Sequence, residues 1–247
     1  MIKPCIVIPV YDHENAIGTT LRSLLRFCIP VLLIDDGSHT PCRDCLKELS
    51  KKYADDVTLF RLPTNQGKGA AVKEGIEQAQ VLGYTHVIQI DADGQHNEED
   101  IPLFFEAAAH NPKAVITGVP RFTENVPKVR LYSRYLTHIW VWINTLSFAI
   151  KDAMCGFRVY PVEQICALLS EEKLGNRMEF DIEILVHWVW RKGPVRNIET
   201  TVNYPSDGVS HFDTVKDNIL ISATHARLFF GMCRRLPALV RGKIARG

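Results

Sequence analysis

Short apolar segments alternate with longer amphipathic segments through residues 1–118, and this alternation constrains the fold more than any other feature of the sequence. The short segments are rich in Val, Ile and Leu, which is typical of strands buried on both faces. The longer segments have helical periodicity. Strands that alternate with helices predict an α/β fold with a doubly wound, mostly parallel sheet and helices on both faces. The expected strands are Pro4–Val10, Val31–Ile34, Val57–Leu62, Thr85–Ile90 and Ala114–Thr117, with helices at Ile17–Phe27, Cys42–Tyr53, Gly69–Leu82 and Glu98–His110.

The alternation weakens after residue 118. Helical patterns at Tyr132–Ile150 and Asp181–Arg191 surround the strand-like segments Gly156–Pro161 and Val195–Tyr204. No linker rich in Gly, Ser or Pro separates the two parts. We therefore expect one domain over residues 1–247, in which residues 119–215 pack on the same sheet as residues 1–118 and residues 216–247 form a C-terminal segment.

The composition excludes several classes of protein. Lys and Arg number 29 against 28 Asp and Glu, for a net charge of +1, and this balance predicts no nucleic-acid partner. The 7 cysteines are an odd number scattered through the chain, which favours a reducing cytosol over a disulfide framework. No segment reaches the roughly 18 apolar residues that span a bilayer. Because the N-terminus also lacks the pattern of a signal peptide, we expect a cytoplasmic protein.

Polar clusters follow four of the expected strands. In open parallel sheets, ligands bind outside the carboxyl ends of the strands, so these clusters predict a common binding edge. The clusters are Tyr11-Asp12, Asp35-Asp36-Gly37-Ser38, Asn65 to Gly69, and Asp91 to His96.

The segment Asp91-Ala92-Asp93-Gly94-Gln95-His96 is the strongest signal for a metal site. Two carboxylates at the end of a buried strand are costly unless a cation pairs with them. Mg²⁺ or Mn²⁺ suits these oxygen ligands, with Gln95 as a neutral ligand and a diphosphate completing the shell. The alternative is a solvated turn, since Asp and Gly are common turn residues.

Two other clusters have both a binding and a structural interpretation. Asp36 can hydrogen-bond a ribose hydroxyl or a base, although Asp-Gly is also an ordinary turn. The segment Asn65–Gly69 precedes a helix, so its N–H groups can face an anion and Lys68 can add a positive charge. The spacing is not that of a P-loop, and a purely structural glycine turn is the alternative.

The order of the segments IPVYD, DDGS, NQGKGAA, DADGQH and GFR resembles the inverting family 2 glycosyltransferases with a GT-A fold. Within that family it is most similar to the polyprenyl (dolichyl) phosphate sugar synthase branch, over about residues 4–215. The resemblance implies that residues 1–118 bind a nucleotide sugar and residues 119–215 bind the acceptor. The implied donor-binding residues are Pro9, Tyr11, Asp36, Gly67, Lys68 and Asp91; the implied metal ligands are Asp91, Asp93 and Gln95; and the implied acceptor and catalytic residues are Arg121, Arg134, Asp152, Arg158 and His211.

The resemblance implies an inverting, metal-dependent transfer from a nucleotide-diphospho-sugar, with the metal and Lys68 stabilising the leaving diphosphate. A lipid phosphate acceptor needs no base, and the three arginines can position it. A hydroxyl acceptor on a glycan or small molecule needs a general base, for which Asp152 is the first candidate and His211 the second. A non-catalytic nucleotide-sugar-binding or membrane scaffold protein is the third possibility.

The C-terminal segment is basic and amphipathic. No acidic residue follows Asp217, which predicts an interfacial segment on an anionic membrane, at its cytosolic face. The alternative is a helix that packs on the domain and exposes its basic face. For Trp140, Trp142 and Phe148, helical spacing favours core packing over lipid contact. The basic residues of the segment are Arg227, Arg234, Arg235, Arg241, Lys243 and Arg246.

Overall fold

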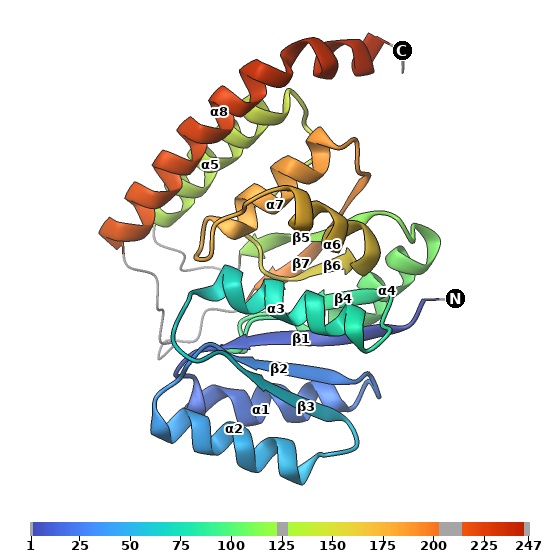
Figure 1. Ribbon diagram of the computed structural model, residues 1–247, viewed down its shortest axis with the longest axis vertical. Helices are drawn as coiled ribbons and strands as arrows, with labels where there is room; N and C mark the ends of the chain where they lie inside the picture. Colours follow the sequence, from blue (N-terminus) through green and yellow to red (C-terminus); the bar gives the residue numbers. More distant parts are fainter. Residues whose placement is uncertain (1, 123–127, 203–213, 245–247) are drawn as a thin grey trace.

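One seven-stranded sheet, in the order β3-β2-β1-β4-β6-β5-β7, runs through the centre of the molecule (Figure 1). The computed structural model describes residues 2–122, 128–202 and 214–244. Neighbouring strands are parallel except at β6, which is antiparallel to both β4 and β5. The predicted α/β fold with a mostly parallel sheet is therefore confirmed. The strands are β1 (Pro4–Val10), β2 (Val31–Asp35), β3 (Val57–Arg61), β4 (His86–Gln89), β5 (Val115–Phe122), β6 (Arg158–Pro161) and β7 (Val195–Val202).

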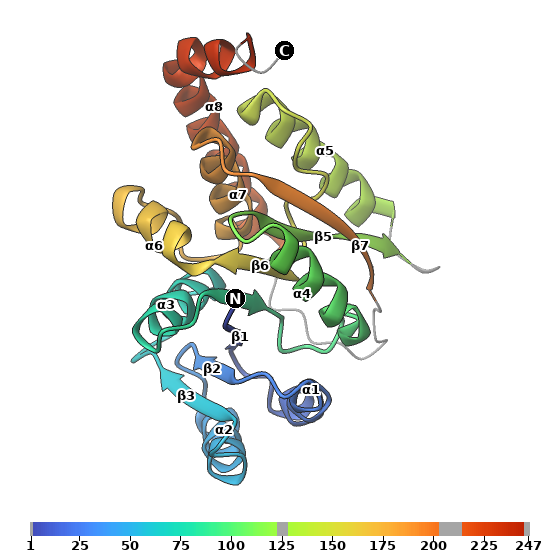
Figure 2. The same cartoon turned by 90° about the vertical axis from the view of Figure 1, so that its right-hand side faces the viewer.

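Helices cover both faces of the sheet, as Figure 2 shows from the end of the sheet. One face carries α1 (Glu14–Leu25), α2 (Thr40–Lys52) and α4 (Ile101–His110), the last preceded by the short 3-10 helix Glu98–Asp100. The other face carries α3 (Lys68–Val81), α6 (Val162–Glu171) and α7 (Phe180–Trp190). The long helices α5 (Lys128–Thr145) and α8 (Thr214–Ile244) pack against each other and on α7.

Strand β1 shows why the first strands read as continuous apolar runs. Ile6 and Ile8 point into the core beneath α1 and α4, whereas Cys5 and Val7 point into the core beneath α3. All four side chains are fully buried, because helices cover both faces of the sheet. Alternation of polar and apolar residues is therefore absent from these strands.

The second half of the chain departs from the predicted pattern in two respects. The helix α6 was missing from the sequence prediction, because its segment Val162–Glu171 follows β6 without a separating turn signal. The helix predicted at Tyr132–Ile150 ends earlier, at Thr145, because Leu146 adopts a left-handed conformation with φ 50°. The predicted strand Val195–Tyr204 is described as far as Val202.

The C-terminal helix α8 directs two of its basic side chains toward the protein. Arg227 forms an ion pair with Glu183 of α7, whose side chain is almost fully buried. Arg235 lies 3.0 Å from Glu172 and stacks on Trp190, with its guanidinium 4.6 Å from the ring centroid. These contacts attach α8 to the domain, although the side chain of Arg227 remains 61% exposed.

The aromatic residues predicted to be core residues are not all buried. Phe148 is 79% exposed and Trp140 is 37% exposed. Trp142 is half-buried and packs edge-on against Phe148, with the ring centroids 5.3 Å apart. Core packing was therefore the wrong prediction for Phe148 and only partly right for Trp140. None of the helices in the described part of the chain is long and apolar enough to cross a membrane.

Candidate functional site

The predicted binding edge forms because β1, β2 and β4 are adjacent and parallel. The last residue of β1, Val10, lies opposite Asp35 of β2, and the Asp36 N–H donates to the Val10 carbonyl at 2.8 Å. Strand β4 flanks β1 on the other side, so Asp91 emerges at the same edge. The chain order of the clusters does not place them together; the strand order of the sheet does.

Asp36 organises the glycine-rich loop before α3. Its two carboxylate oxygens accept the N–H groups of Gln66 at 2.7 Å and Gly67 at 2.8 Å. Burial raises the pKa of Asp36, and the two N–H bonds oppose that rise. Gly67 has φ 104°, and a Cβ there would meet the Asn176 carbonyl at 2.5 Å, so only glycine fits. The structure thus gives Asp36 a loop-holding role that the sequence did not predict.

The residues after β1 lie beside the start of α2. Tyr11 follows the strand directly, and its ring centroid lies 6.1 Å from that of His39. Asp12 has φ 50° and accepts the backbone N–H of His39 at 2.8 Å, while its other oxygen lies 2.6 Å from the His39 ring. Pro9 is buried within β1 opposite Ile34, so it shapes the strand and does not reach the surface of the site.

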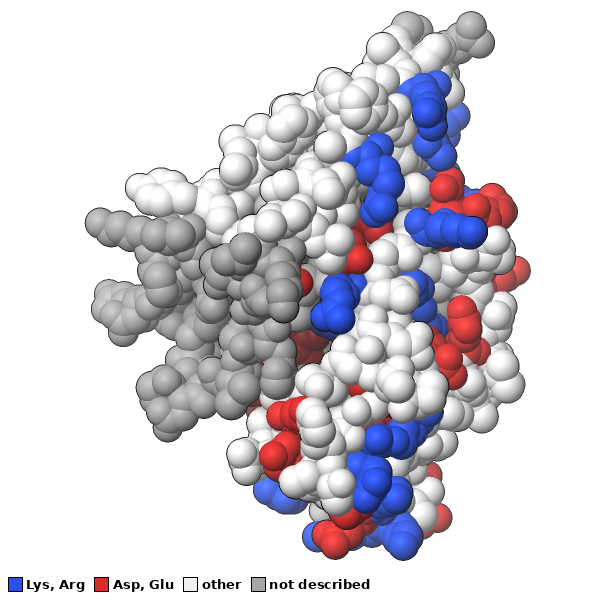
Figure 3. Space-filling model, turned by 60° about the vertical axis from the view of Figure 1, so that its left-hand side comes forward, with Lys and Arg blue, Asp and Glu red and all other residues white. Residues whose placement is uncertain are grey.

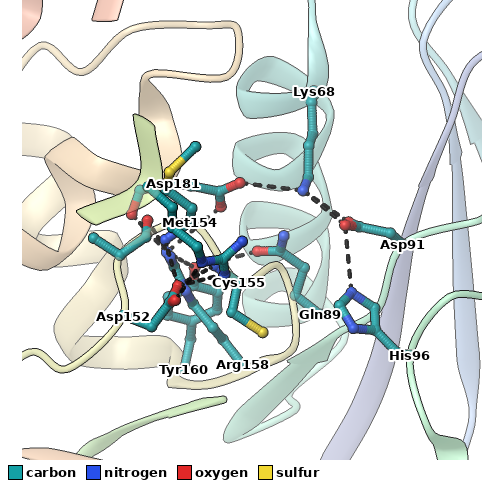
Figure 4. Close-up of polar contacts among 12 residues, drawn as sticks. Lys68, Gln89, Asp91, His96, Asp152, Met154, Cys155, Arg158, Tyr160 and Asp181 are labelled. Atoms are coloured by element: carbon teal, nitrogen blue, oxygen red, sulfur yellow. Dashed lines mark hydrogen bonds and ion pairs between the residues drawn. The ribbon is translucent and has the colours of Figure 1, made fainter. Parts of the chain in front are cut away.

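A largely buried cation lies between two carboxylates at the end of β4 (Figure 4). The Nζ atom of Lys68, the first residue of α3, lies 2.8 Å from Asp91 Oδ1 and 3.1 Å from Asp181 Oδ2. Burial alone would lower the pKa of Lys68, but the carboxylates of Asp181 and Asp91 hold it well above its ordinary value. Conversely, burial would raise the pKa of Asp91, but Lys68 and His96, whose Nε2 lies 3.4 Å away, hold it well below its usual range.

Asp181 is a site residue that sequence reasoning missed. It lies in α7 and joins Lys68 to Arg158, whose NH1 is 3.5 Å from Asp181 Oδ1. The signal in the sequence was two acidic residues, Asp181 and Glu183, in the otherwise apolar start of a helix, Phe180 to Leu185. A buried carboxylate on an apolar helix needs a cation as partner, and only the tertiary structure identifies Lys68 as that partner.

The Asp91 to Gln95 turn has the chemistry that a divalent cation requires. Burial and the neighbouring charge of Asp91 raise the pKa of Asp93, so a cation beside this carboxylate would relieve an unfavourable environment. Asp93 Oδ1 accepts the backbone N–H of Gln95 at 3.1 Å. In the described part of the chain, no three His, Cys, Asp or Glu side chains converge as a metal centre. Asp91, Asp93 and Gln95 therefore fit Mg²⁺ or Mn²⁺ only if further oxygens come from a bound diphosphate.

The Gly156-Phe157-Arg158 segment packs directly against the proposed metal turn. A Cβ at Gly156 would overlap the Asp91 carboxylate, so a side chain at this position would displace Asp91, a proposed metal ligand. Phe157 stacks on Phe104 of α4, with the ring centroids 3.9 Å apart, and this contact fixes the segment from the other side. The close approach of this segment to Asp91 explains why position 156 is a glycine.

Arg158 does not lie where a substrate phosphate could reach it, and the expectation that it positions the acceptor is corrected here. Its side chain is fully buried, and its N–H groups donate to the carbonyls of Asp181 at 2.7 Å and Ala153 at 2.8 Å. It also donates to the Tyr160 hydroxyl at 3.2 Å, which in turn donates to Gln89. Arg158 is therefore a positioning residue beneath the site.

Asp152 has an environment that does not suit a general base. Arg134 donates to both of its oxygens, at 2.6 and 2.7 Å, and His138 Nε2 lies 3.2 Å away. The N–H groups of Met154 and Cys155 add two hydrogen bonds of 2.8 Å. Burial would raise the pKa of Asp152, but His138 and Arg134 hold it well below its usual range. A carboxylate with so low a pKa accepts a proton poorly near neutral pH.

No described contact joins Arg121, another predicted acceptor residue, to Asp152 and its partners. Arg121 lies on β5, is largely exposed and forms an ion pair with Glu199 of β7. His211 lies outside the described residues. The structure therefore brings Lys68, Asp91 and Asp93 together at one edge, and it pairs Arg134 of α5 with Asp152 in the segment between α5 and β6.

Comparisons with known proteins agree with this geometry. The family model described as "Glycosyl transferase family 2" matches residues 5–176. An uncharacterized protein of Methanocaldococcus jannaschii is 26% identical over 216 residues, covering 85% of this chain and 92% of that protein. A dolichyl-phosphate beta-glucosyltransferase of Trichomonas vaginalis is 27% identical over 217 residues, covering 80% of this chain and 64% of that protein.

The fold is also similar to that of a solved enzyme structure. Glucosyl-3-phosphoglycerate synthase from Mycobacterium tuberculosis, in complex with Mn²⁺ and UDP-glucose, superposes with a TM-score of 0.69 at 13% identity. The match covers 94% of this chain and 79% of that one. The family match covers well over half of the chain, and the fold carries the acidic turn at the carboxyl end of β4. The chain belongs to glycosyl transferase family 2 and is a glycosyltransferase with the GT-A fold.

Proposed function

We propose that this protein transfers a sugar from a nucleotide-diphospho-sugar to a polyprenyl-type lipid phosphate, with inversion and with a divalent cation. The observation that carries the proposal is Lys68, a largely buried cation between Asp91 and Asp181 at the carboxyl end of β4. The dolichyl-phosphate relative supports the lipid acceptor, and the Mn²⁺ and UDP-glucose complex of the structural neighbour supports the donor and the metal.

The donor diphosphate would lie beside Lys68 and the acidic turn. Asp91, Asp93 and Gln95 would hold Mg²⁺ or Mn²⁺, which supplies positive charge against the leaving diphosphate. Lys68 stays protonated because its two carboxylates hold its pKa high, so it adds a second fixed positive charge at the same place. A single in-line displacement, with the acceptor opposite the leaving group, inverts the anomeric carbon.

The acceptor side favours a phosphate over a hydroxyl. A lipid phosphate is already an anion and needs positioning by cations, for which Arg134 and Arg121 are the proposed residues. A hydroxyl acceptor needs a base, and Asp152 is bound by Arg134 and two backbone N–H groups. The hydroxyl alternative therefore lacks support at its first candidate residue.

A lipid acceptor implies contact with a membrane, which we place at the cytosolic face. All seven cysteines of the chain are free thiols, which suits a reducing compartment. The anionic membrane contact proposed from the sequence rested on the basic residues of α8. Of those residues, Arg227 and Arg235 form ion pairs with the protein, whereas Arg234 is exposed.

Calorimetric titration tests the donor site. UDP, GDP and their sugar conjugates are titrated with and without Mn²⁺ into the wild type, Asp93→Ala and the control Asp55→Ala, which removes an exposed carboxylate before β3. We expect metal-dependent binding of one nucleotide, lost in Asp93→Ala alone. Absence of nucleotide binding in every metal condition would refute the proposal.

A transfer assay tests the acceptor. The donor identified by titration is incubated with a polyprenyl phosphate or with the matching polyprenol, and the products are separated by chromatography. Transfer to the phosphate and not to the alcohol is expected. Transfer to the alcohol alone would favour the hydroxyl mechanism instead.

A further inference from the structure

The outer surface of α5 is apolar and exposed. The residues Tyr132, Tyr135, Leu136, Ile139 and Ile143 recur with spacings of three and four, so they form one stripe on the helix. Their exposed fractions range from 39% for Ile143 to 71% for Tyr132. The opposite side of α5 is buried and packs on α7 and α8. An exposed stripe of this kind on a protein surface marks an interaction site.

The stripe continues onto α8. Trp140 packs edge-on against Phe229, with the ring centroids 6.3 Å apart, and Phe229 packs in the same manner against Phe230. Phe230 is 65% exposed. Figure 3 shows a broad uncharged surface over the upper part of the molecule, with Lys and Arg gathered along one side of it. We call the five residues of the α5 stripe together with Phe230 the apolar face.

Three arginines of the two helices form ion pairs within the protein, whereas Arg234 of α8, one turn beyond Phe230, is exposed. Arg134 is the one Lys, Arg, Asp or Glu between residues 132 and 145, and it is directed into the site, where it pairs with Asp152. On α8, Arg227 and Arg235 pair with Glu183 and Glu172. Carboxylates of the protein therefore hold three of the arginines on these two helices.

We propose that the apolar face docks on a lipid bilayer, with α5 lying in the boundary between headgroups and acyl chains, and that apolar burial carries the contact. Tyr132 and Tyr135 suit this boundary, because tyrosine combines an apolar ring with a polar tip. From Tyr132 to Ile143 the stripe is about 16 Å long, at 1.5 Å per residue, which suits a helix that lies in the interface.

The choice of a bilayer over a second copy of the chain rests partly on the proposed lipid acceptor. Helix α5 carries the apolar stripe on its outer side and Arg134 on the side of Asp152. Docking through the stripe would hold the Arg134–Asp152 pair beside the bilayer surface, where a lipid-linked phosphate resides. A second copy of the chain on the same face would instead cover this approach.

Vesicle binding tests the proposal. The wild type is sedimented with vesicles of phosphatidylcholine alone, at low and at high salt, beside the double variant Leu136→Glu/Ile139→Glu. The control Val81→Glu places the same charge at a side chain that is 79% exposed at the end of α3. We expect the wild type and the control to bind neutral vesicles with little dependence on salt. The double variant should bind at least about tenfold more weakly, since two apolar side chains are lost from the contact.

Three outcomes would overturn the proposal. The first is wild-type binding only to vesicles with anionic lipid, abolished by salt. The second is equal binding by the wild type and the double variant. The third is a wild-type dimer that the double variant converts to monomer, with no difference on vesicles, because a second copy then occupies the face. Thermal melting confirms that each variant is folded.

Nucleotide titration separates this proposal from the proposed function. A double variant that binds the nucleotide but not vesicles supports the apolar face as a distinct docking surface. Wild type that binds neutral vesicles but no nucleotide would refute the donor site and leave the docking surface in place.

Discussion

Replacing Lys68 by Met tests whether the buried ion pairs hold the site together. The Nζ atom lies 2.8 Å from Asp91 and 3.1 Å from Asp181, and an effective dielectric constant of about 20 gives roughly 5 to 6 kcal/mol of attraction for each pair. Desolvation offsets most of that attraction in the wild type. Removing one partner leaves the other charges buried, which costs about 3 to 5 kcal/mol.

The lower end of that range applies here. The side chains of Lys68 and Asp91 are 17% and 25% exposed, so water partly screens them. His96 and Arg158 also stay near the two carboxylates. We therefore expect Lys68→Met to lower the free energy of unfolding by about 3 kcal/mol. Urea denaturation followed by circular dichroism measures it, with an unchanged m-value as evidence that the folded and unfolded states are otherwise the same.

Two further variants make this measurement decisive. Lys51→Met, at an exposed lysine near the end of α2, should change stability by less than about 0.5 kcal/mol. The double variant Lys68→Met/Asp181→Asn should lose less stability than the sum of the single variants, by about 1 kcal/mol or more, because Asn removes the orphaned charge. A Lys68→Met variant as stable as Lys51→Met would refute the reasoning that the three charges form a buried unit.

Three other predictions follow from the same structure. Gly156→Ala should lower stability by about 1 to 3 kcal/mol and weaken nucleotide binding in calorimetry, because its Cβ would overlap Asp91; unchanged binding would contradict this close approach. Arg134→Ala should lower stability by about 3 kcal/mol in urea denaturation, since Asp152 would stay buried, and Arg134→Ala/Asp152→Asn should recover part of that loss. Burial lowers the pKa of His225 to about 4, so the unfolded chain binds more protons below pH 6.5 and stability should fall between pH 6.5 and 4, by at most about 3 kcal/mol. His225→Gln should remove that part of the pH dependence in denaturation at several pH values, and an identical pH profile would contradict it.

Sequence reasoning located the elements of the first half because their signals are local. Each strand from β1 to β4 is a short, mostly apolar run that is followed within four residues by Asp or Asn, and the segments between them have helical periodicity. The boundaries shifted by only a few residues. The long helix α5 was also expected, but its end depends on the conformation of Leu146, which no periodicity reveals.

The candidate site was predictable in part. Asp91, Asp93 and Lys68 could be proposed because clusters that follow parallel strands share one edge of the sheet. Asp181 and the partner of Asp152 could not, because each pairs with a residue on another element far away in the sequence. The burial of Arg158 could not be predicted for the same reason.

The sequence by itself determined the alternation of strands and helices, the acidic turn after β4 and the family to which the chain belongs, because periodicity and short motifs lie within single segments. The tertiary structure alone decided the antiparallel insertion of β6, the burial of Arg158 and the inward direction of Arg227 and Arg235. It also left the apolar stripe of α5 exposed. An amphipathic pattern shows that a helix has two faces, but which face meets solvent depends on the partners that distant segments supply.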